Sequence, residues 1–327
     1  MWEGFETIWE KEISNPDSDV RVIPVPTYSR GSDDSLYDAE YITTGYPAGV
    51  EITDINSYDL KANHPDTIYV QNIEDASNPG FAVHPHFHTS NIRSFCEELV
   101  YIPYNCMSGI NPSDPDLDKY FSRLLIPQGL GNVDRIIVHS ENMKNVYLTL
   151  LAGHNEVLMH EWDKKISFED YPRAALLRKY TKDTVPYPKS WDRYLFDSSG
   201  NRKETVLFAT SVFGVLEYNR THFRKIRETL EKYLSDRDST ALIWRPNKNL
   251  PETIMKLRPE LFDVFRALLE FYITNDIGIF DETIAPTPAI ILSDAYIGDN
   301  CGVKELFVST GKPVLEWTSS FDKYMLI

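Results

Sequence analysis

Two polar segments in the second half of the chain are candidates for binding a phosphate group. Residues 298–302, Gly-Asp-Asn-Cys-Gly, come between a predicted strand and a predicted helix, and Arg245 and Asn247 end the strand predicted at 241–247. Free backbone N–H groups and the helix dipole favour an anion at a helix N-terminus. The segment at 300–303 is therefore a candidate phosphate-binding site. The alternative is that it is only a tight turn between strand and helix.

Three histidines alternate in the run His84-Pro85-His86-Phe87-His88. Alternate residues of a strand share a face, so three imidazoles could hold a metal, or one could act as a general base. Pro85 weakens the strand assignment and no acidic fourth ligand lies nearby, so the sequence favours the general base and predicts no metal site. His222 stands alone in a predicted helix, which is typical of a surface or capping residue.

The first half of the chain alternates short apolar runs with amphipathic ones. Strands are predicted at 20–26, 67–72, 99–104 and 135–140, each nearly apolar throughout, which is typical of strands buried on both faces of a parallel sheet. Helices are predicted at 4–14, 116–124 and 141–152, the last after the capping residue Ser140.

The second half repeats this alternation. Strands are predicted at 205–211, 241–247, 277–281, 289–297 and 313–317, and helices near 216–234 and 251–274. Strand–helix alternation implies parallel βαβ units, so the fold class is α/β with doubly wound sheets. Ligands of such sheets bind beyond the carboxyl ends of the strands.

Composition and length predict two domains in the 327 residues. The prediction is an N-terminal domain at 1–190, which opens with a helix as if its first strand were missing, a polar linker at 191–204 and a C-terminal domain at 205–327. The linker belongs to a proline-containing polar stretch over 183–204.

Charge and motifs exclude several classes of protein. The chain has 33 Lys and Arg against 49 Asp and Glu, a net charge of −16, which argues against nucleic-acid binding and anionic membranes. It has no apolar run long enough to span a bilayer, no signal peptide and three cysteines without metal-site spacing, so a cytoplasmic protein is expected. It also lacks the GxGxxG, P-loop, GxSxG and HExxH motifs.

Several blocks of the sequence resemble one family, in the same order along the chain. They are 64–75, 83–93, 99–104, 133–147, 209–219, 242–254, 255–265 and 293–315. The sequence resembles the CDP-glycerol:poly(glycerophosphate) glycerophosphotransferases of teichoic acid synthesis. The resemblance implies a GT-B fold, in which two Rossmann-like domains face a cleft and the C-terminal one binds most of the donor. It also implies a location at the inner face of the membrane.

The resemblance further implies which residues act. The acceptor-activating histidine falls on His84. The donor-binding positions, on loops after or between the C-terminal strands, are Ser211, Arg245, Asn247, Asp294, Asp299, Asn300, Cys301 and Gly302. Asn247 replaces a histidine of the family, and Cys301 and Gly302 replace two serines, so charge and hydroxyl donors are lost.

Three functions follow from these observations. The first is transfer of glycerol phosphate, or a related polyol phosphate, from a CDP-linked donor to a hydroxyl of a glycan or polyol-phosphate acceptor, without a cofactor or metal. The second is a catalytically impaired protein that binds a nucleotide or glycan, or serves as an assembly partner. The third is a GT-B glycosyltransferase or epimerase that uses a nucleotide-sugar, because one fold hosts several reactions.

Overall fold

A computed structural model describes residues 2–31, 33–78, 81–104, 106, 107, 109–315 and 317 of the chain. These residues divide into two units. The first lies within 1–105 and 110–176, and the second within 106–109 and 177–327. The division at 176/177 falls inside the helix α7 (Pro172–Lys179), earlier in the chain than the predicted linker.

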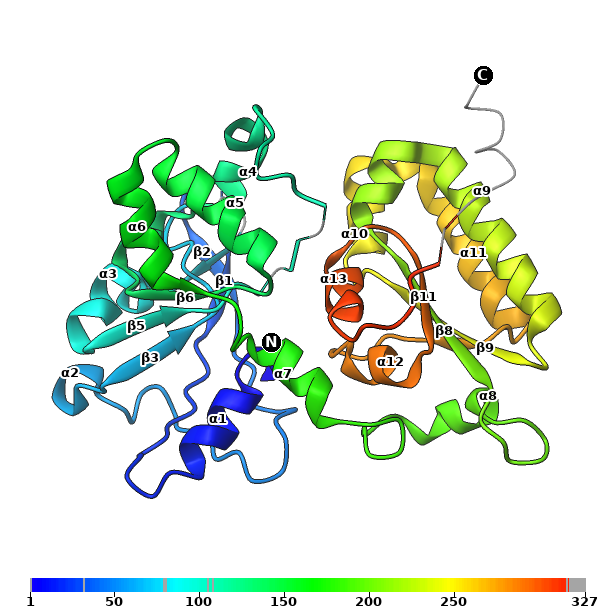
Figure 1. The fold of residues 1–327 in the computed structure, drawn as a ribbon, viewed down its shortest axis with the longest axis horizontal. Coiled ribbons are helices and arrows are strands. Elements are labelled where there is room, and N and C mark those ends of the chain that lie inside the picture. The colour runs from blue at the N-terminus through cyan, green and yellow to red at the C-terminus, as the bar shows by residue number, and fades with distance from the viewer. Residues whose placement is uncertain are drawn as a thin grey trace. The chain divides into compact units, whose positions relative to one another are not determined.

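The first unit contains a parallel sheet of four strands in the order β3-β5-β6-β7 (Figure 1). The strands are β3 (Thr67–Val70), β5 (Glu98–Tyr101), β6 (Arg135–Ile137) and β7 (Ile166–Ser167). Three of them confirm predicted strands. The predicted strand at 20–26 is wrong, since only Val22 forms an isolated bridge there, to Ile52. Prolines in that run remove backbone donors that a sheet requires.

A second, antiparallel sheet in the first unit has the order β2-β1-β4. Its strands are β1 (Thr27–Arg30), β2 (Leu36–Glu40) and β4 (Phe81–Val83). The helices of this unit are α1 (Glu6–Ile13), α2 (Leu60–Asn63), α3 (Thr89–Ile92), α4 (Leu117–Leu125), α5 (Glu141–Ala152) and α6 (Glu156–Lys165), with α7 at its end. The predicted cap of α5 is confirmed, because Oγ of Ser140 accepts the N–H of Met143 at 3.2 Å.

The second unit contains a parallel sheet in the order β10-β9-β8-β11 (Figure 1). Its strands are β8 (Glu204–Thr210), β9 (Thr240–Pro246), β10 (Ile279–Phe280) and β11 (Ala295–Gly298). Phe208 and Trp244 pack on α9 (Val212–Asp236) and α11 (Phe262–Thr274), while Leu207 and Ile243, which alternate with them, are also fully buried. Both faces of the sheet are therefore covered, which explains the apolar runs in the sequence.

Two predicted elements of this unit are divided in the structure. The helix predicted at 251–274 is split into α10 (Leu250–Leu257) and α11, because Pro259 cannot continue a helix. The strand predicted at 289–297 begins as a helix, α12 (Thr287–Leu292), and only β11 is extended. After α13 (Gly302–Val308), the run predicted as a fifth strand contributes an isolated parallel bridge from Val314 to Tyr296.

The predicted linker at 191–204 is wrong, because these residues are folded as part of the second unit. The segment contains the helix α8 (Asp192–Leu195), and the side chains of Trp191 and Leu195 are buried. The N–H of Lys203 donates to the carbonyl of Leu195 at 2.8 Å, which closes a turn before β8. The α/β fold class, with a parallel sheet in each unit, is confirmed. Within the described residues, no helix is long and apolar enough to cross a membrane.

Candidate functional site

The strand order of the second unit reverses between β8 and β11. From β8 the chain adds β9 and β10 on one side and then returns to place β11 on the other. In open α/β sheets, ligands bind at such a reversal, beyond the carboxyl ends of the strands. The residues that follow β8 and β11 are Ser211 and Asp299, so two of the candidate residues leave the sheet side by side.

Ser211 and Asp299 bind each other at this edge. The N–H of Ser211 donates to Oδ2 of Asp299 at 2.6 Å, and Oγ of Ser211 caps α9 by accepting the N–H of Gly214 at 3.0 Å. Nε2 of His222, a residue of α9, lies 3.2 Å from the same Oδ2, and both side chains are buried. The Asp299 carboxylate therefore lies at the positive end of α9, where an external anion would otherwise bind.

Glycine is required where Asp299 meets α9. A Cβ on Gly214 would lie 2.7 Å from Oδ2 of Asp299 and 2.7 Å from Cε1 of His222. His222 is thus a buried partner of the candidate site, which corrects the surface or capping role expected from the sequence. His222 comes eight residues, just over two turns, after Gly214, and this spacing is the only local signal that the two residues lie on neighbouring parts of the helix surface.

The turn between β11 and α13 has one exposed polar side chain and one that is half-buried. Asn300 is exposed, and its Oδ1 accepts a hydrogen bond from Nζ of Lys304. Sγ of Cys301 lies 3.6 Å from the Tyr296 hydroxyl, and burial raises the pKa of this thiol. A Cβ on Gly302 would lie 2.5 Å from the carbonyl oxygen of Cys106, so the backbone of 106 covers the start of α13.

Arg245 turns away from this reversal, towards the loop that follows β10. Its Nη1 donates to Oδ2 of Asp281 at 2.6 Å, and its Nη2 donates to the carbonyl of Thr283 at 2.8 Å. The Asp281 side chain is completely buried, so the charge of Arg245 is compensated inside the unit. Because β8 lies between β9 and β11, Arg245 does not converge with 300–302. The expectation that Arg245 contributes to a phosphate-binding site with 300–302 is therefore wrong.

Asn247 closes the turn between β9 and α10. Its Oδ1 accepts the N–H of Asn249 at 2.9 Å, and its own N–H donates to the carbonyl of Thr210 at 2.8 Å. The side chain is exposed at the same edge of the sheet as Ser211. Asparagine is well suited to such a turn, since its short amide bonds the backbone two residues on.

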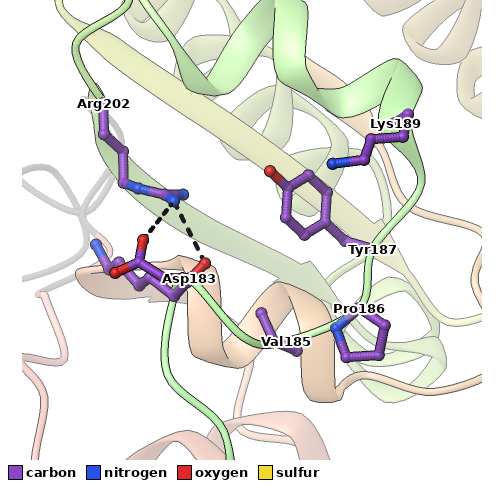
Figure 2. A pocket seen from close by; sticks show the side chains of 7 residues that line it. Asp183, Val185, Pro186, Tyr187, Lys189 and Arg202 are labelled. Carbon is purple, nitrogen blue, oxygen red and sulfur yellow. Dashed lines mark hydrogen bonds and ion pairs between the residues drawn. The ribbon is translucent and has the colours of Figure 1, made fainter.

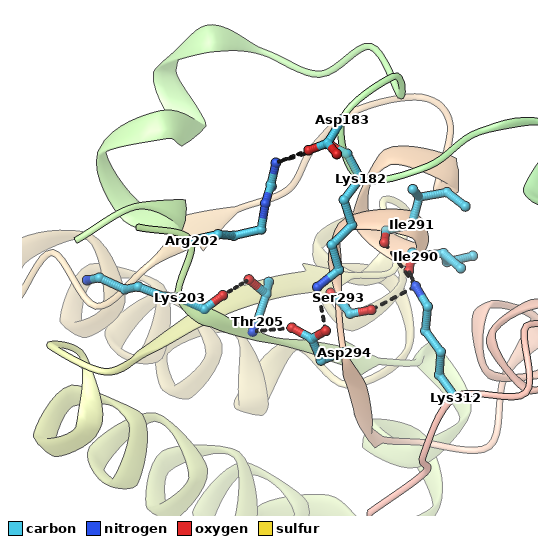
Figure 3. Close-up of polar contacts among 10 residues, drawn as sticks. All are labelled: Lys182, Asp183, Arg202, Lys203, Thr205, Ile290, Ile291, Ser293, Asp294 and Lys312. Carbon is cyan, nitrogen blue, oxygen red and sulfur yellow. Dashed lines mark hydrogen bonds and ion pairs between the residues drawn. The ribbon is translucent and has the colours of Figure 1, made fainter. Parts of the chain in front are cut away.

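Asp294 lies at the opposite edge of the sheet. It precedes β11, and its Oδ2 accepts the N–H of Thr205, near the start of β8, at 3.0 Å. Its Oδ1 pairs with Nζ of Lys182 (Figure 3). At ~3.3 Å per residue, β11 separates Asp294 from Asp299 by more than ten ångströms. The grouping of Asp294 with the other donor-binding candidates is therefore wrong.

His84 lies in the first unit, at the end of β4. The run from His84 to His88 is not a strand, since Pro85–Phe87 form a 3-10 helix, and its alternate imidazoles do not share a face. The described residues contain no group of His, Cys, Asp or Glu placed to hold a metal. Nδ1 of His84 accepts the N–H of His86 at 3.2 Å. The neutral ring then carries its proton on Nε2, which leaves that nitrogen without a lone pair for an acceptor hydroxyl.

Asp281 is the other residue that the sequence reasoning did not select. It follows the predicted strand at 277–281 at the carboxyl edge, and this position is the signal that could have identified it. Oδ1 of Asp281 also accepts the N–H of Thr283 at 2.9 Å, so it organises the whole loop around Arg245.

No family model and no curated protein matches this chain. Among solved structures it is similar to the wall teichoic acid polymerase TagF, at 15% identity, over 70% of this chain and 51% of that one, with a TM-score of 0.43. A TagF variant soaked with CDPG is 13% identical over 86% and 60%, at 0.44. A UDP complex of S. aureus MnaA is 14% identical over 84% and 67%, at 0.42. The chain spans about half the length of the first TagF structure.

Proposed function

We propose that this chain is a transferase that uses a nucleotide-linked donor, and that its second unit binds the nucleotide at the edge where β8 and β11 end. One observation carries this proposal, namely the reversal of strand order between these two strands. The turn after β8 and the turn after β11 are joined there by the bond from Ser211 to Asp299. The proposed phosphate lies over the turn after β11, next to the exposed amide of Asn300, and not at the start of α9, which the Asp299 carboxylate occupies.

The finer proposal is that the donor is CDP-glycerol. The resemblance of the sequence blocks to the glycerophosphotransferases supports it. In this reaction an acceptor hydroxyl oxygen attacks the β-phosphorus of the donor. The bond from that phosphorus to the oxygen of CMP breaks, CMP leaves, and the acceptor proton passes to a base.

His84 is the proposed base, and its hydrogen bond with the N–H of His86 must break before it can accept a proton at Nε2. Nδ1 has to release the N–H of His86, so that the proton can occupy Nδ1 and free the lone pair of Nε2. Since His84 is exposed and stands at the start of a single 3-10 turn, this rearrangement needs only a local movement.

A second candidate function is nucleotide binding without turnover. Two observations favour it. Arg245, the expected charge partner of the donor, is compensated by buried Asp281, and His84 rests in a tautomer that cannot accept a proton at Nε2. A protein of this kind would bind CMP or a glycan but release no product.

The nucleotide site can be tested by adding one negative charge to it. Asn300→Asp keeps the size of an exposed side chain beside Lys304, and it places a carboxylate where the phosphate is proposed. We expect CMP affinity, measured by calorimetry, to fall about tenfold, the equivalent of ~1.4 kcal/mol. The matched control is Asn155→Asp, the same change at the exposed N-cap of α6, where both side chains cap well. An unchanged CMP affinity in Asn300→Asp would contradict the site.

Turnover separates the two candidate functions. We expect wild-type protein to release CMP from CDP-glycerol in the presence of a polyol-phosphate acceptor, and His84→Ala to lose this activity while CMP affinity stays the same. CMP binding without CMP release, in both proteins, would support the binding protein and contradict the transferase.

A further inference from the structure

A cavity of about 360 Å³ lies in the second unit, lined by residues of the proline-containing polar stretch over 183–204 and by Lys182 just before it. Its walls include Lys182, Asp183, Tyr187, Lys189 and Arg202 (Figure 2). These residues precede β8, so the cavity is near the amino ends of the strands, away from the edge proposed for the nucleotide. Its volume falls within the range of small-molecule sites, ~300–1,000 Å³.

Arg202 is fixed in this wall by two hydrogen bonds and an aromatic contact. Its Nη2 donates to Oδ1 of Asp183 at 3.2 Å and to the carbonyl of Lys182 at 3.3 Å. The guanidinium carbon lies 4.9 Å from the ring centroid of Phe196. Nη1 is buried and has no hydrogen-bond partner among the described residues. Because Nη1 is buried, a ligand in the cavity can contact only the part of the Arg202 side chain that stays exposed, 22% of it.

Tyr187 and Lys189 face the same space. Figure 2 shows the Tyr187 hydroxyl pointing towards Arg202, with the Lys189 ammonium beside the tyrosine ring. The ring is fixed because its hydroxyl donates to Oδ1 of Asp192 at 2.8 Å. Nζ of Lys189 lies 5.4 Å from the ring centroid, so this exposed cation can reach an anion bound next to Arg202.

Charge in the cavity is opposite to that of the whole chain. Lys182, Lys189 and Arg202 face one carboxylate, Asp183, and Asp294 pairs with Lys182 from outside the wall. The residues that line the cavity thus carry three cations and one carboxylate on a chain of net charge −16, while the carboxylates of Asp294 and Asp192 lie just outside the lining. Nζ of Lys312 does not line the cavity, since it donates to the carbonyls of Ile290, Ile291 and Ser293 (Figure 3).

We propose that this cavity binds a phosphate dianion carried on a small organic group, a phosphate monoester, with Arg202, Lys189 and Lys182 around the phosphate. The planar fork of arginine and two ammonium groups match the several oxygens of a phosphate better than the two of a carboxylate. The cavity is larger than a phosphate group, and its remaining wall is the ring of Tyr187 with Val185 and Pro186. The organic group lies against these apolar surfaces.

Calorimetry on the full chain tests the proposal, with inorganic phosphate and glycerol phosphate as probes and CMP present at saturation. The monoester is expected to bind more tightly than inorganic phosphate. Arg202→Gln is expected to weaken the monoester about tenfold or more, and Arg202→Lys to weaken it less, because the charge remains but the fork is lost. The control Arg237→Gln, at an exposed arginine bonded to the carbonyl of Asn275, is expected to bind like wild type.

Lys189→Gln gives a second variant at an exposed position, in case replacement of Arg202 prevents folding. It is expected to weaken the monoester severalfold. Equal affinity of both probes would overturn the monoester assignment. Unchanged affinity in Lys189→Gln and the Arg202 variants, or no binding at millimolar probe, would overturn the site. Because Arg202 and Lys189 lie outside the proposed nucleotide site, weaker probe binding in their variants reports on this cavity even if CMP does not bind.

Discussion

Position 302 is a glycine because the backbone of Cys106, distant in sequence, leaves no room there for a side chain. The carbonyl of Cys106 lies where a Cβ would be, 2.5 Å from its ideal position. Restoring a serine here, as the resemblance to the glycerophosphotransferases would suggest, therefore adds a clash as well as a hydroxyl. The sequence alone shows only that a serine of the family is missing, because no local pattern reveals the approach of residue 106.

We expect Gly302→Ala to destabilise the protein by about 1–3 kcal/mol, since the backbone of Cys106 must move to admit the methyl group. The free energy of unfolding from urea denaturation measures this. Gly131→Ala is the control, because a Cβ there meets nothing within 4 Å. Equal stability of the two variants would show that the contact at 302 is not tight.

Tyr233 links stability to alkaline pH. Burial, followed by the nearby charges of Glu204 and Asp236, raises its pKa to about 12, whereas an unfolded tyrosine has a pKa of ~10. The unfolded state therefore ionises first, so the contribution of Tyr233 to stability is constant below about pH 10 and is lost as the pH rises towards about 12.

Tyr233→Phe removes this contribution. Urea denaturation at pH 9 and at pH 11 should show a smaller loss of stability in the variant than in the wild type. The side chain is almost fully buried, so phenylalanine keeps the packing. The same loss in both proteins would mean that Tyr233 titrates normally.

Helices and strands that are set by local sequence signals were predictable. Features that depend on contacts with residues distant in the sequence were not. The cap at Ser140 and the strands at 204–210 and 240–246 follow from local signals, a serine before a helix and apolar runs between polar ends. The helical start of 289–297 was not predictable, because α12 and β11 are both buried and a continuous apolar run suits either. The position of Arg245 depends on Asp281, 36 residues away.

The segment 189–204 offers a test at the level of elements. A linker would exchange its amide protons rapidly, whereas the structure gives Phe196 and Lys203 backbone bonds to Asp192 and Leu195. We expect hydrogen exchange measured by mass spectrometry to show slow exchange at 195–197 and at 203, and fast exchange only at the exposed turn of 198–201. Rapid exchange along the whole segment would contradict the folded assignment.

At the scale of the whole molecule, each unit has its own sheet and its own buried core, and the division between them falls at 176/177. The sequence predicted two α/β domains but placed the division later, because polar and proline-rich composition is shared by linkers and by surface turns that pack on a domain. The polar stretch over 183–204 lines most of the basic cavity, so its composition reflects a wall of charged side chains that includes Arg202 and Lys189.

The position of CMP on the second unit tests the central claim most directly. Titration of isotope-labelled full-length protein with CMP, followed by amide NMR chemical shifts, identifies which edge of the sheet binds. The account predicts that the largest shifts are those of Ser211, Gly214, Asn300 and Gly302, at the carboxyl ends of β8 and β11, while Thr205 and Asp294 at the amino edge change little. Shifts confined to the amino edge, or none at saturating CMP, would contradict it.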